Sequence, residues 1–294
     1  MRLRDFLLLV FVCVTWGFNN VLSRTVVGVW HVPPLFFATL RFALVLAVTF
    51  PWLWPIPRPV WRIATVGALM GGGTFALLFV GLQTATPSLA AIVVQAGVPL
   101  TTLLSVLVLH EWIHWRRGAG IALTLAGVLI VIWRPGFALS VGVLFVLGST
   151  VSGSVGAIMM KQMEDIAPLR FQAWVGLTGF ALLAPASALL ERGQWQAATA
   201  IGWPFVGAVL FTALVVSVCA HSFYYWLIAR YEANLLSPLT LMTPLATIGL
   251  SVCLLGDRLD ARMIVGAVLA LAGVLVIALR TRTTSIVVAQ EERG

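Results

Sequence analysis

Aromatic and amide side chains recur at intervals of three or four residues inside long apolar stretches of this sequence. In a helix, that spacing places side chains on one face. Amide groups in hydrocarbon need hydrogen-bonding partners, so such a face must meet another helix or a wet cavity. Aromatic rings could hold an apolar group there, and amides could hold an ammonium. The candidate binding residues selected in this way are Trp16, Asn19, Phe75, Phe79, Gln95, His221, Tyr224 and Tyr225.

Two ionisable residues lie deep inside apolar stretches. Arg41 is near the middle of one stretch, and His221 is well inside another. A charged group inside a membrane is costly and rarely faces lipid. Arg41 therefore either binds backbone carbonyls at a broken helix or attracts a substrate carboxylate. His221 either forms hydrogen bonds in a cavity or carries a proton.

Pro99 and Pro244 interrupt two further apolar stretches. A proline lacks the N–H that would bond the carbonyl four residues earlier in a helix. Those carbonyls belong to Gln95 and Thr240. Each proline is either a structural kink whose carbonyl is satisfied within the protein or a hinge whose carbonyl faces a cavity.

These residues must be positioned by membrane-spanning helices. Hydrophobic residues make up 61% of the chain and charged residues 10%, with a mean hydropathy of +1.03. A soluble domain carries about 25% charged residues. Stretches long enough to cross a bilayer run over 6–26, 33–54, 62–83, 87–109, 117–134, 140–161, 168–190, 203–228, 235–255 and 263–280. We therefore predict an all-α integral membrane protein with ten transmembrane helices.

The net charge of +8 reflects membrane topology better than nucleic-acid binding. When the N-terminus is assigned to the cytoplasm and the sides alternate, the cytoplasmic segments hold twelve Lys and Arg residues and the outer loops hold five. Positive charge accumulates on the cytoplasmic side of membrane proteins. We expect both termini to be cytoplasmic, and we expect no nucleic-acid partner.

A phrase is repeated in the two halves of the chain. Residues 125–132 read LAGVLIVI and residues 271–278 read LAGVLVIA, 146 positions later. The match extends upstream, where Pro99 aligns with Pro244 and Glu111 with Asp257. Five helices fit in one period, so the second copy enters the membrane from the opposite side. Inverted repeats around a central cavity are associated with alternating access in secondary transporters.

Small residues replace polar ones in the last helix of each repeat. The two small-residue stripes are Gly120, Thr124 and Gly127 in one helix, and Gly266, Ala270 and Gly273 in the other. Such stripes permit close helix packing without chemistry. Polar stripes in other helices include Asn20, Ser217, Thr240, Thr243 and Thr247.

The sequence resembles the drug/metabolite transporter superfamily, in its ten-helix branch with two EamA-type domains. The resemblance rests on TWGFNN at 15–20, LRF at 40–42 and the duplicated spacing from proline to acid. It implies one five-helix repeat at 1–134, a connector at 135–139, a second repeat at 140–281 and a cytoplasmic tail at 282–294. It also implies a location in the bacterial inner membrane and similarity to exporters of aromatic amino acids.

Carboxylates are missing from the predicted spans, since all ten Asp and Glu residues lie at their ends, in connectors or in the tail. Proton or sodium coupling commonly uses an intramembrane carboxylate. We therefore expect export of small amphipathic metabolites, including aromatic amino acids, by facilitated diffusion. Proton-coupled export of drugs or other metabolites is the alternative. A channel is disfavoured because no selectivity sequence recurs.

A membrane-embedded enzyme is a more distant alternative. Residues 110–114 read HEWIH, which fits the HExxH pattern of zinc enzymes. The segment lies at a helix junction, and its counterpart in the second repeat, 256–260, reads GDRLD. We expect no enzymatic activity, no metal and no cofactor. The expected partners are a small-molecule substrate and the lipid bilayer, with the chain a monomer or a weak homo-oligomer.

Overall fold

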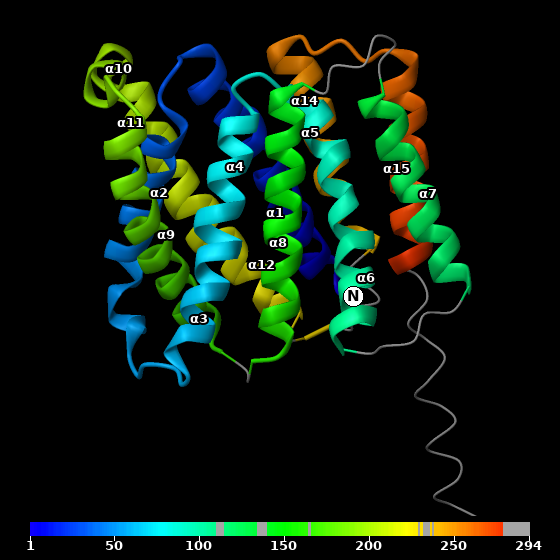
Figure 1. Ribbon diagram of the computed structural model, residues 1–294, viewed down its shortest axis with the longest axis horizontal. Helices are drawn as coiled ribbons and strands as arrows, with labels where there is room; N and C mark the ends of the chain where they lie inside the picture. Colours follow the sequence, from blue (N-terminus) through cyan, green and yellow to red (C-terminus); the bar gives the residue numbers. More distant parts are fainter. Residues whose placement is uncertain are drawn as a thin grey trace, which may run out of the picture.

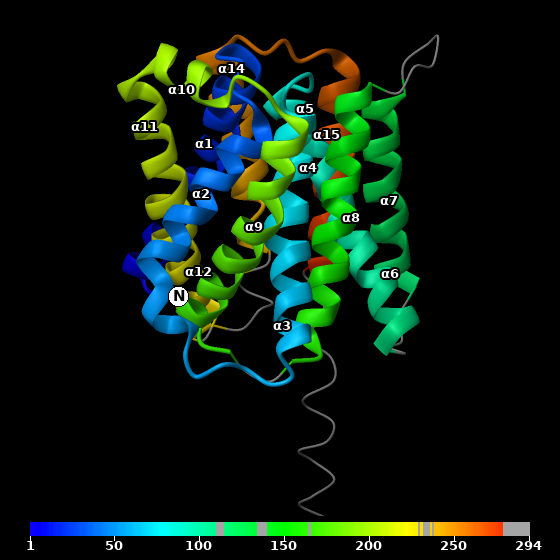
Figure 2. The ribbon, with the colours of Figure 1, turned by 60° about the vertical axis from the view of Figure 1, so that its left-hand side comes forward.

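Long apolar helices arranged side by side form the body of the protein (Figures 1 and 2). The computed structural model describes residues 1–109, 115–133, 140–163, 166–228, 230–231, 236 and 238–278, without the side chains of Leu109, Lys161, Tyr225 and Ile228. Across these described residues the regular structure is helical throughout. The prediction of an all-α protein is therefore confirmed.

The first half of the chain contains helices whose axes are broken by short irregular turns. The elements are α1 (Leu3–Arg24), η1 (Thr25–Val29), α2 (Pro34–Thr49), η2 (Phe50–Leu53), α3 (Val60–Gly67), η3 (Ala68–Gly73), α4 (Thr74–Gly81), α5 (Pro87–Val93), η4 (Val94–Ala96), α6 (Gly97–Leu109) and α7 (Trp115–Ile132). The turns η1 and η3 are π-helical, whereas η2 and η4 are 3₁₀ turns.

The second half also contains helices that are broken by an irregular turn. Its elements are α8 (Val141–Lys161), α9 (Pro168–Leu190), α10 (Gln194–Ile201), α11 (Trp203–Leu210), η5 (Phe211–Ala220), α12 (His221–Ile228), α14 (Met242–Leu255) and α15 (Ala261–Ala278). The turn η5 is π-helical over ten residues.

Nine helical segments in the described ranges are long and apolar enough to cross a membrane. They are Leu3–Val29, Pro34–Leu53, Val60–Gly81, Pro87–Val108, Trp115–Ile132, Val141–Met160, Pro168–Leu190, Trp203–Tyr224 and Ala261–Ala278. The tenth predicted stretch, 235–255, contains the shorter apolar helix Met242–Leu255, and residues 232–235 and 237 lie outside the described ranges.

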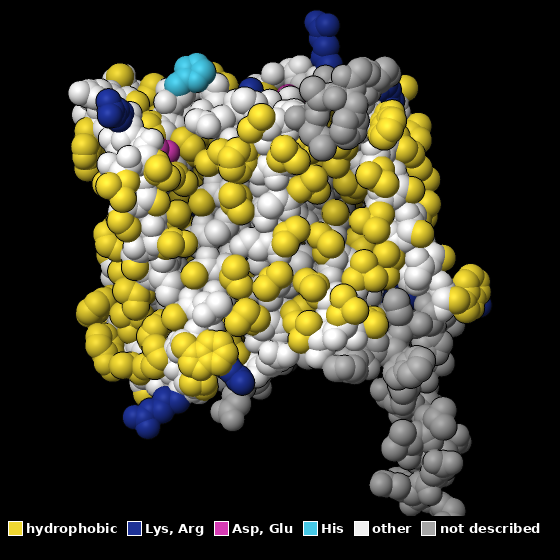
Figure 3. All heavy atoms as spheres, viewed as in Figure 1, with side chains coloured by type: hydrophobic (Ala, Val, Ile, Leu, Met, Phe, Trp, Pro, Cys, Tyr) yellow, Lys and Arg dark blue, Asp and Glu magenta, His cyan; other side chains and the backbone are white. Residues whose placement is uncertain are grey.

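The surface has the charge distribution of a membrane protein. Hydrophobic side chains cover the flanks, and Lys and Arg side chains gather towards the two ends (Figure 3). The start of α1 and the last turn of α15 lie towards the same end (Figure 1).

Helices from the first half pack against helices from the second. The most extensive pairs are α7 with α15, α2 with α9, α1 with α14 and α4 with α8. Further contacts join α6 with α8, and α1 with η5 and α12. The two halves are therefore interleaved, so the interior of the bundle is built by both of them.

The two small-residue stripes pack against each other. A Cβ atom added to Gly127 would lie 2.4 Å from the Ala270 nitrogen, and one added to Gly273 would lie 2.5 Å from the Thr124 nitrogen. Only glycine permits backbones this close. The Thr124 hydroxyl donates to the Gly120 carbonyl of its own helix at 2.9 Å, so no polar group is left for chemistry.

Both predicted hinge prolines stand at equivalent places in the structure. Pro99 is the third residue of α6, directly after the 3₁₀ turn η4, and Pro244 is the third residue of α14. Proline is tolerated in the first turn of a helix. At Thr240 the structure favours the alternative in which the carbonyl is satisfied within the protein, because the helix is broken there and the Thr243 N–H donates to that carbonyl at 2.9 Å.

Candidate functional site

A small cavity, here called the central cavity, lies between α1, α4, α5, η4 and α14. Its volume is about 100 Å³, and its lining residues are Asn20, Leu78, Ala90, Ala91, Val94, Gln95, Thr243, Pro244 and Thr247. A cavity of this volume holds several water molecules but is smaller than the roughly 300–1,000 Å³ of small-molecule sites. A larger solute would therefore need these helices to move apart.

The polar side of the central cavity comes from α1 and α14. The Asn20 Nδ2 donates to the Thr247 Oγ1 at 3.3 Å, and the Thr247 hydroxyl donates to the Thr243 carbonyl at 3.0 Å. Thr243 also lines the cavity. The Asn20 amide and the Thr247 hydroxyl make this wall suited to exchange hydrogen bonds with a solute.

Gly17 brings these two helices together. A Cβ atom at this position would lie 2.9 Å from both the Thr247 nitrogen and the Ala246 Cβ. Contacts shorter than 3.0 Å require a neighbour to shift. The glycine in the TWGFNN segment thus allows the α1 side chains to reach the wall formed by α14.

An aromatic group of three residues, here called the Trp16 cluster, stands one helical turn from Asn20 on the same face of α1. The Trp16 ring centroid lies 5.1 Å from that of His221 and 5.0 Å from that of Tyr224. The His221 Nδ1 lies 2.8 Å from the Val216 carbonyl, to which it donates. The structure therefore brings together three residues that the sequence predicted separately, and the buried Trp16 Nε1 has no hydrogen-bonding partner.

Arg41, on α2, is fully buried and faces η5. Its Nε donates to the Ser217 Oγ at 3.0 Å, and its guanidinium lies over the Phe75 ring at 4.0 Å from the centroid. Its Nη1 has no hydrogen-bonding partner, and no ion pair within the described ranges reaches it. Ser217 precedes His221 by four residues. Arg41 and Trp16 therefore contact adjacent turns of the continuous helical segment formed by η5 and α12.

The other predicted residues have different surroundings. Asn19 is buried, and its Oδ1 has no hydrogen-bonding partner. Phe79 is fully buried in the hydrophobic core, where its ring contacts Phe37 and Phe75, and it does not line the central cavity. Tyr225 belongs to α12, but its side chain lies outside the described residues.

Residues that the sequence placed on polar stripes without selecting them as binding residues complete the site. Asn20, Thr243 and Thr247 line the central cavity, and Ser217 binds Arg41. The spacing of four from Trp16 to Asn20, and from Thr243 to Thr247, carries this signal. The apolar lining residues have no such signal, because they match the composition of a lipid-facing helix.

Described carboxylates outside the spans act as structural caps. The two Glu191 oxygens accept hydrogen bonds from the Leu35 and Phe36 N–H groups, each at 2.8 Å, at the first turn of α2. The Asp257 Oδ2 accepts from the Ser251 hydroxyl at 2.6 Å. Negative groups stabilise helix N-termini, so these acids already have structural roles.

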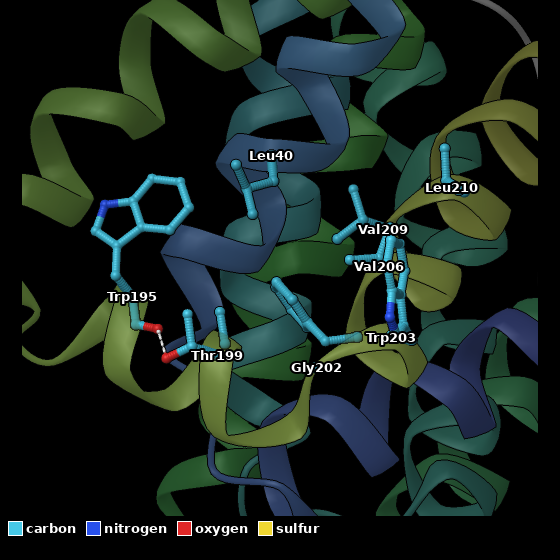
Figure 4. Close-up of a pocket in the computed structure, with 10 residues that line it drawn as sticks. Leu40, Trp195, Thr199, Gly202, Trp203, Val206, Val209 and Leu210 are labelled. Carbon is cyan, nitrogen blue, oxygen red and sulfur yellow. Dashed lines mark hydrogen bonds between the residues drawn. The ribbon is translucent and has the colours of Figure 1, made fainter.

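A larger pocket at the periphery has no such polar groups. It has a volume of about 440 Å³ and lies between α2, α10 and α11, where Trp195 and Trp203 flank it (Figure 4). The Thr199 hydroxyl donates to the Trp195 carbonyl at 2.8 Å. Trp203 is 85% exposed. We interpret this pocket as a lipid-facing groove.

Metal-ligating clusters of three or more His, Cys, Asp and Glu residues do not occur in the part of the chain that the structure describes. The HEWIH segment, 110–114, lies outside that part.

The fold and this site define a multi-pass α-helical membrane protein with a partly polar interior. The chain belongs to the EamA-like transporter family, whose profile matches residues 4–133 and 140–279. It is therefore a membrane transporter by family.

Similar proteins extend over nearly the whole chain. A "Probable amino-acid metabolite efflux pump" of Salmonella typhimurium (strain LT2) is 31% identical, covering 94% of this chain and 95% of the relative. An Escherichia coli (strain K12) protein with the same name is 28% identical at the same coverage. A transporter of Bacillus subtilis (strain 168) is 29% identical. A crystal structure at 21% identity covers both chains completely with a TM-score of 0.62, which supports the fold.

Proposed function

We propose that this protein exports small amphipathic metabolites, with amino acids, including aromatic ones, as the main substrates. The observation that carries the proposal is the placement of the Trp16 cluster next to the polar wall of the central cavity. Aromatic faces suit an apolar side chain, and hydroxyl and amide groups suit an ammonium or carboxyl group. The names of the two enterobacterial relatives support the same substrate class.

Alternating access by two inverted five-helix repeats is the mechanism that we propose. The two matches to the family profile support two units in one chain. The contacts of the small-residue stripes support the inversion, because Gly120 faces Gly273 while Gly127 faces Gly266. Gly120 corresponds to Gly266 in the other repeat, 146 residues later, and Gly273 corresponds to Gly127. Exchanging the two repeats therefore turns the first contact into the second, as a twofold axis in the membrane plane requires.

The helix pairs fit the same symmetry. Packing of α1 on α14 corresponds to packing of α8 on α6, and packing of α4 on α8 corresponds to packing of η5 and α12 on α1. The π-helical turns η3 and η5 also occupy corresponding helices of the two repeats. Such turns frequently lie at functional sites. We infer that these two helices bend when the central cavity opens.

Facilitated diffusion down the substrate gradient is the proposed energetic mode. All acids in the sequence lie outside the predicted spans, and those described next to helix ends cap backbone or hydroxyl groups. Among the described residues, the carboxylate inside a membrane-crossing helix is Asp5, which lies in the first turn of α1 and accepts a hydrogen bond from the Tyr231 hydroxyl. The usual group for ion coupling, a carboxylate at membrane depth, is therefore not among the described residues near the centre of a span. Proton coupling through His221 is the competing possibility. We place the protein in the bacterial inner membrane with both termini cytoplasmic, on the bias of twelve basic residues against five.

Counterflow in proteoliposomes tests the function. Vesicles loaded with unlabelled phenylalanine should accumulate labelled phenylalanine and tyrosine while proton and sodium gradients are collapsed. Labelled nucleosides and cationic dyes serve as competing substrate classes. Accumulation of dyes without amino acids would refute the substrate proposal, whereas strict dependence on a proton gradient would refute facilitated diffusion and direct attention to His221.

A further inference from the structure

A second polar pocket, here called the arginine pocket, shares no lining residue with the central cavity. Its volume is about 320 Å³, and its lining residues are Pro57, Arg58, Pro59, Arg62, Gln162, Met163, Ile166 and Arg170. They come from the connector between α2 and α3, the first turn of α3, the segment after α8 and the first turn of α9. The α2–α3 connector lies at the end of the bundle that carries the N-terminus (Figures 1 and 2).

Among the residues that the structure describes, the guanidinium groups of this pocket have no carboxylate partner. The buried Arg170 Nε has no hydrogen-bonding partner, and the Arg62 Nη1 donates to the neutral Gln162 carbonyl at 3.4 Å. Within the described ranges, no ion pair involves these two arginines or Arg58. Three like charges around one pocket repel each other, so an anion bound between them would lower the electrostatic free energy.

The surroundings of the pocket are those of a membrane interface. Trp54 and Trp61 flank the α2–α3 connector and are 55% and 60% exposed. The Arg62 guanidinium lies 5.5 Å from the Trp61 ring centroid. Tryptophans concentrate at the level of the lipid headgroups. The pocket also has apolar walls, formed by Met163, Ile166 and the two prolines. An occupant with an anionic head and apolar chains therefore fits it best.

We propose that the arginine pocket binds the phosphate group of an anionic phospholipid. Guanidinium groups donate paired hydrogen bonds to phosphate oxygens, a geometry that lysine cannot reproduce. Basic pockets between transmembrane helices are known to hold acidic headgroups. A bound phosphate would join the connector before α3 to the start of α9, so the lipid would hold the two repeats together at this end. The proposal is independent of which solute is transported.

Native mass spectrometry of the purified full-length protein tests the proposal. The probes are phosphatidylglycerol and, as a neutral comparison, phosphatidylcholine, each added to delipidated protein in detergent. We expect one phosphatidylglycerol per chain to remain bound under conditions that remove phosphatidylcholine. The double variant Arg62→Gln/Arg170→Gln should lower its affinity by on the order of 25-fold, at about fivefold for each arginine near a headgroup.

The matched control is Arg116→Gln/Arg117→Gln, which removes the same charge from the first turns of α7, outside the pocket. It should retain phosphatidylglycerol like the parent protein. Equal loss in both double variants would show diffuse charge attraction and overturn the proposal. The charge-preserving variant Arg62→Lys/Arg170→Lys should bind with intermediate affinity, and it replaces the Gln variant if that protein does not fold.

Two further outcomes would also overturn the proposal. Inorganic phosphate alone binding as tightly as phosphatidylglycerol would show a site for a soluble anion. Glu164 and Asp165, which stand between two lining residues in the sequence, lie outside the described residues. Retention of lipid by Glu164→Gln/Asp165→Asn but not by the parent protein would show that these carboxylates neutralise the arginines.

Discussion

The helix pair α7–α15 and the helices around the central cavity are both strongly apolar in sequence but differ in packing. In the pair, glycines bring backbones together, and the Thr124 hydroxyl is satisfied by its own helix. On α1, beside the cavity, the buried polar atoms Trp16 Nε1 and Asn19 Oδ1 have no hydrogen-bonding partner. Native interiors satisfy nearly all such atoms.

This difference separates a scaffold from a working region. A region that must open and take up a solute cannot satisfy all of its polar groups internally, because those groups must exchange partners during transport. A region that only holds helices together can be satisfied completely. We therefore expect substitutions in the pair to affect stability, and substitutions around the cavity to affect transport.

The largest expected effect is on the helix pair. Gly127→Ala places a Cβ within 2.4 Å of the Ala270 nitrogen, so the helices must separate, at a cost of about 3 kcal/mol. Gly118→Ala in the same helix meets no atom within 4 Å and should stabilise by up to about 1 kcal/mol. Thermal unfolding in detergent measures both. Equal midpoints for the two variants would mean that the pair is not closely packed.

Among substitutions around the cavity, loss of Trp16 should have the largest effect on transport. Trp16→Ala removes the ring that contacts His221 and Tyr224. Each aromatic contact is worth roughly 0.5–1.5 kcal/mol and about 1.4 kcal/mol is a factor of ten, so the loss of both should lower counterflow of aromatic amino acids about tenfold. Trp52→Ala, at an exposed position beside the α2–α3 connector, is the control and should transport normally. A similar loss in both would contradict a special role for Trp16.

A hydroxyl in the central cavity should have a smaller effect. Thr247→Val removes the acceptor of the Asn20 amide, and KM should rise about three- to tenfold, since a hydrogen bond contributes about 0.5–1.5 kcal/mol. Thr102→Val is the matched control, because that hydroxyl donates to the Val98 carbonyl of its own helix. Initial rates over a range of substrate concentrations give KM. An unchanged KM in Thr247→Val would remove this wall from the binding site.

The smallest expected effect on stability is at the hinge prolines. Pro244→Ala should change the free energy of unfolding by less than about 1 kcal/mol, because first-turn prolines are tolerated. Transport should nevertheless fall if α14 swings at this point. Pro34→Ala, at the first residue of α2, should change neither quantity. Normal transport by both Pro244→Ala and Pro99→Ala would make these prolines structural helix starts only.

Much of the scaffold could be predicted from the sequence. The spacing of Gly120 and Gly127 against Gly266 and Gly273 identified two packing faces that do meet. Hydrophobicity located the spans because lipid imposes a single length requirement on all of them. The members of the Trp16 cluster were also selected from the sequence, since polar groups at helical spacing are costly to expose to lipid.

Other features depend on contacts that helical periodicity does not contain. Phe75 and Phe79 are one turn apart and of one type, yet Phe75 stacks on Arg41 while Phe79 is in the core. Leucines and alanines of the cavity wall look like lipid-facing residues. The carbonyl of Thr240 is satisfied because the chain breaks its helix before Pro244, a break that the uninterrupted apolar stretch 235–255 does not reveal.

Thiol accessibility at Asn20 tests the central claim, that the central cavity is a solute path opening alternately to both sides. In a chain with Cys13, Cys219 and Cys253 replaced, Asn20→Cys should react with a membrane-impermeant reagent from either side, and phenylalanine should slow the reaction. Leu129→Cys, on the exposed surface of α7, should stay inert in the lipid. If Asn20→Cys is as inert as Leu129→Cys and phenylalanine has no effect, the cavity is a packing defect and the account is wrong.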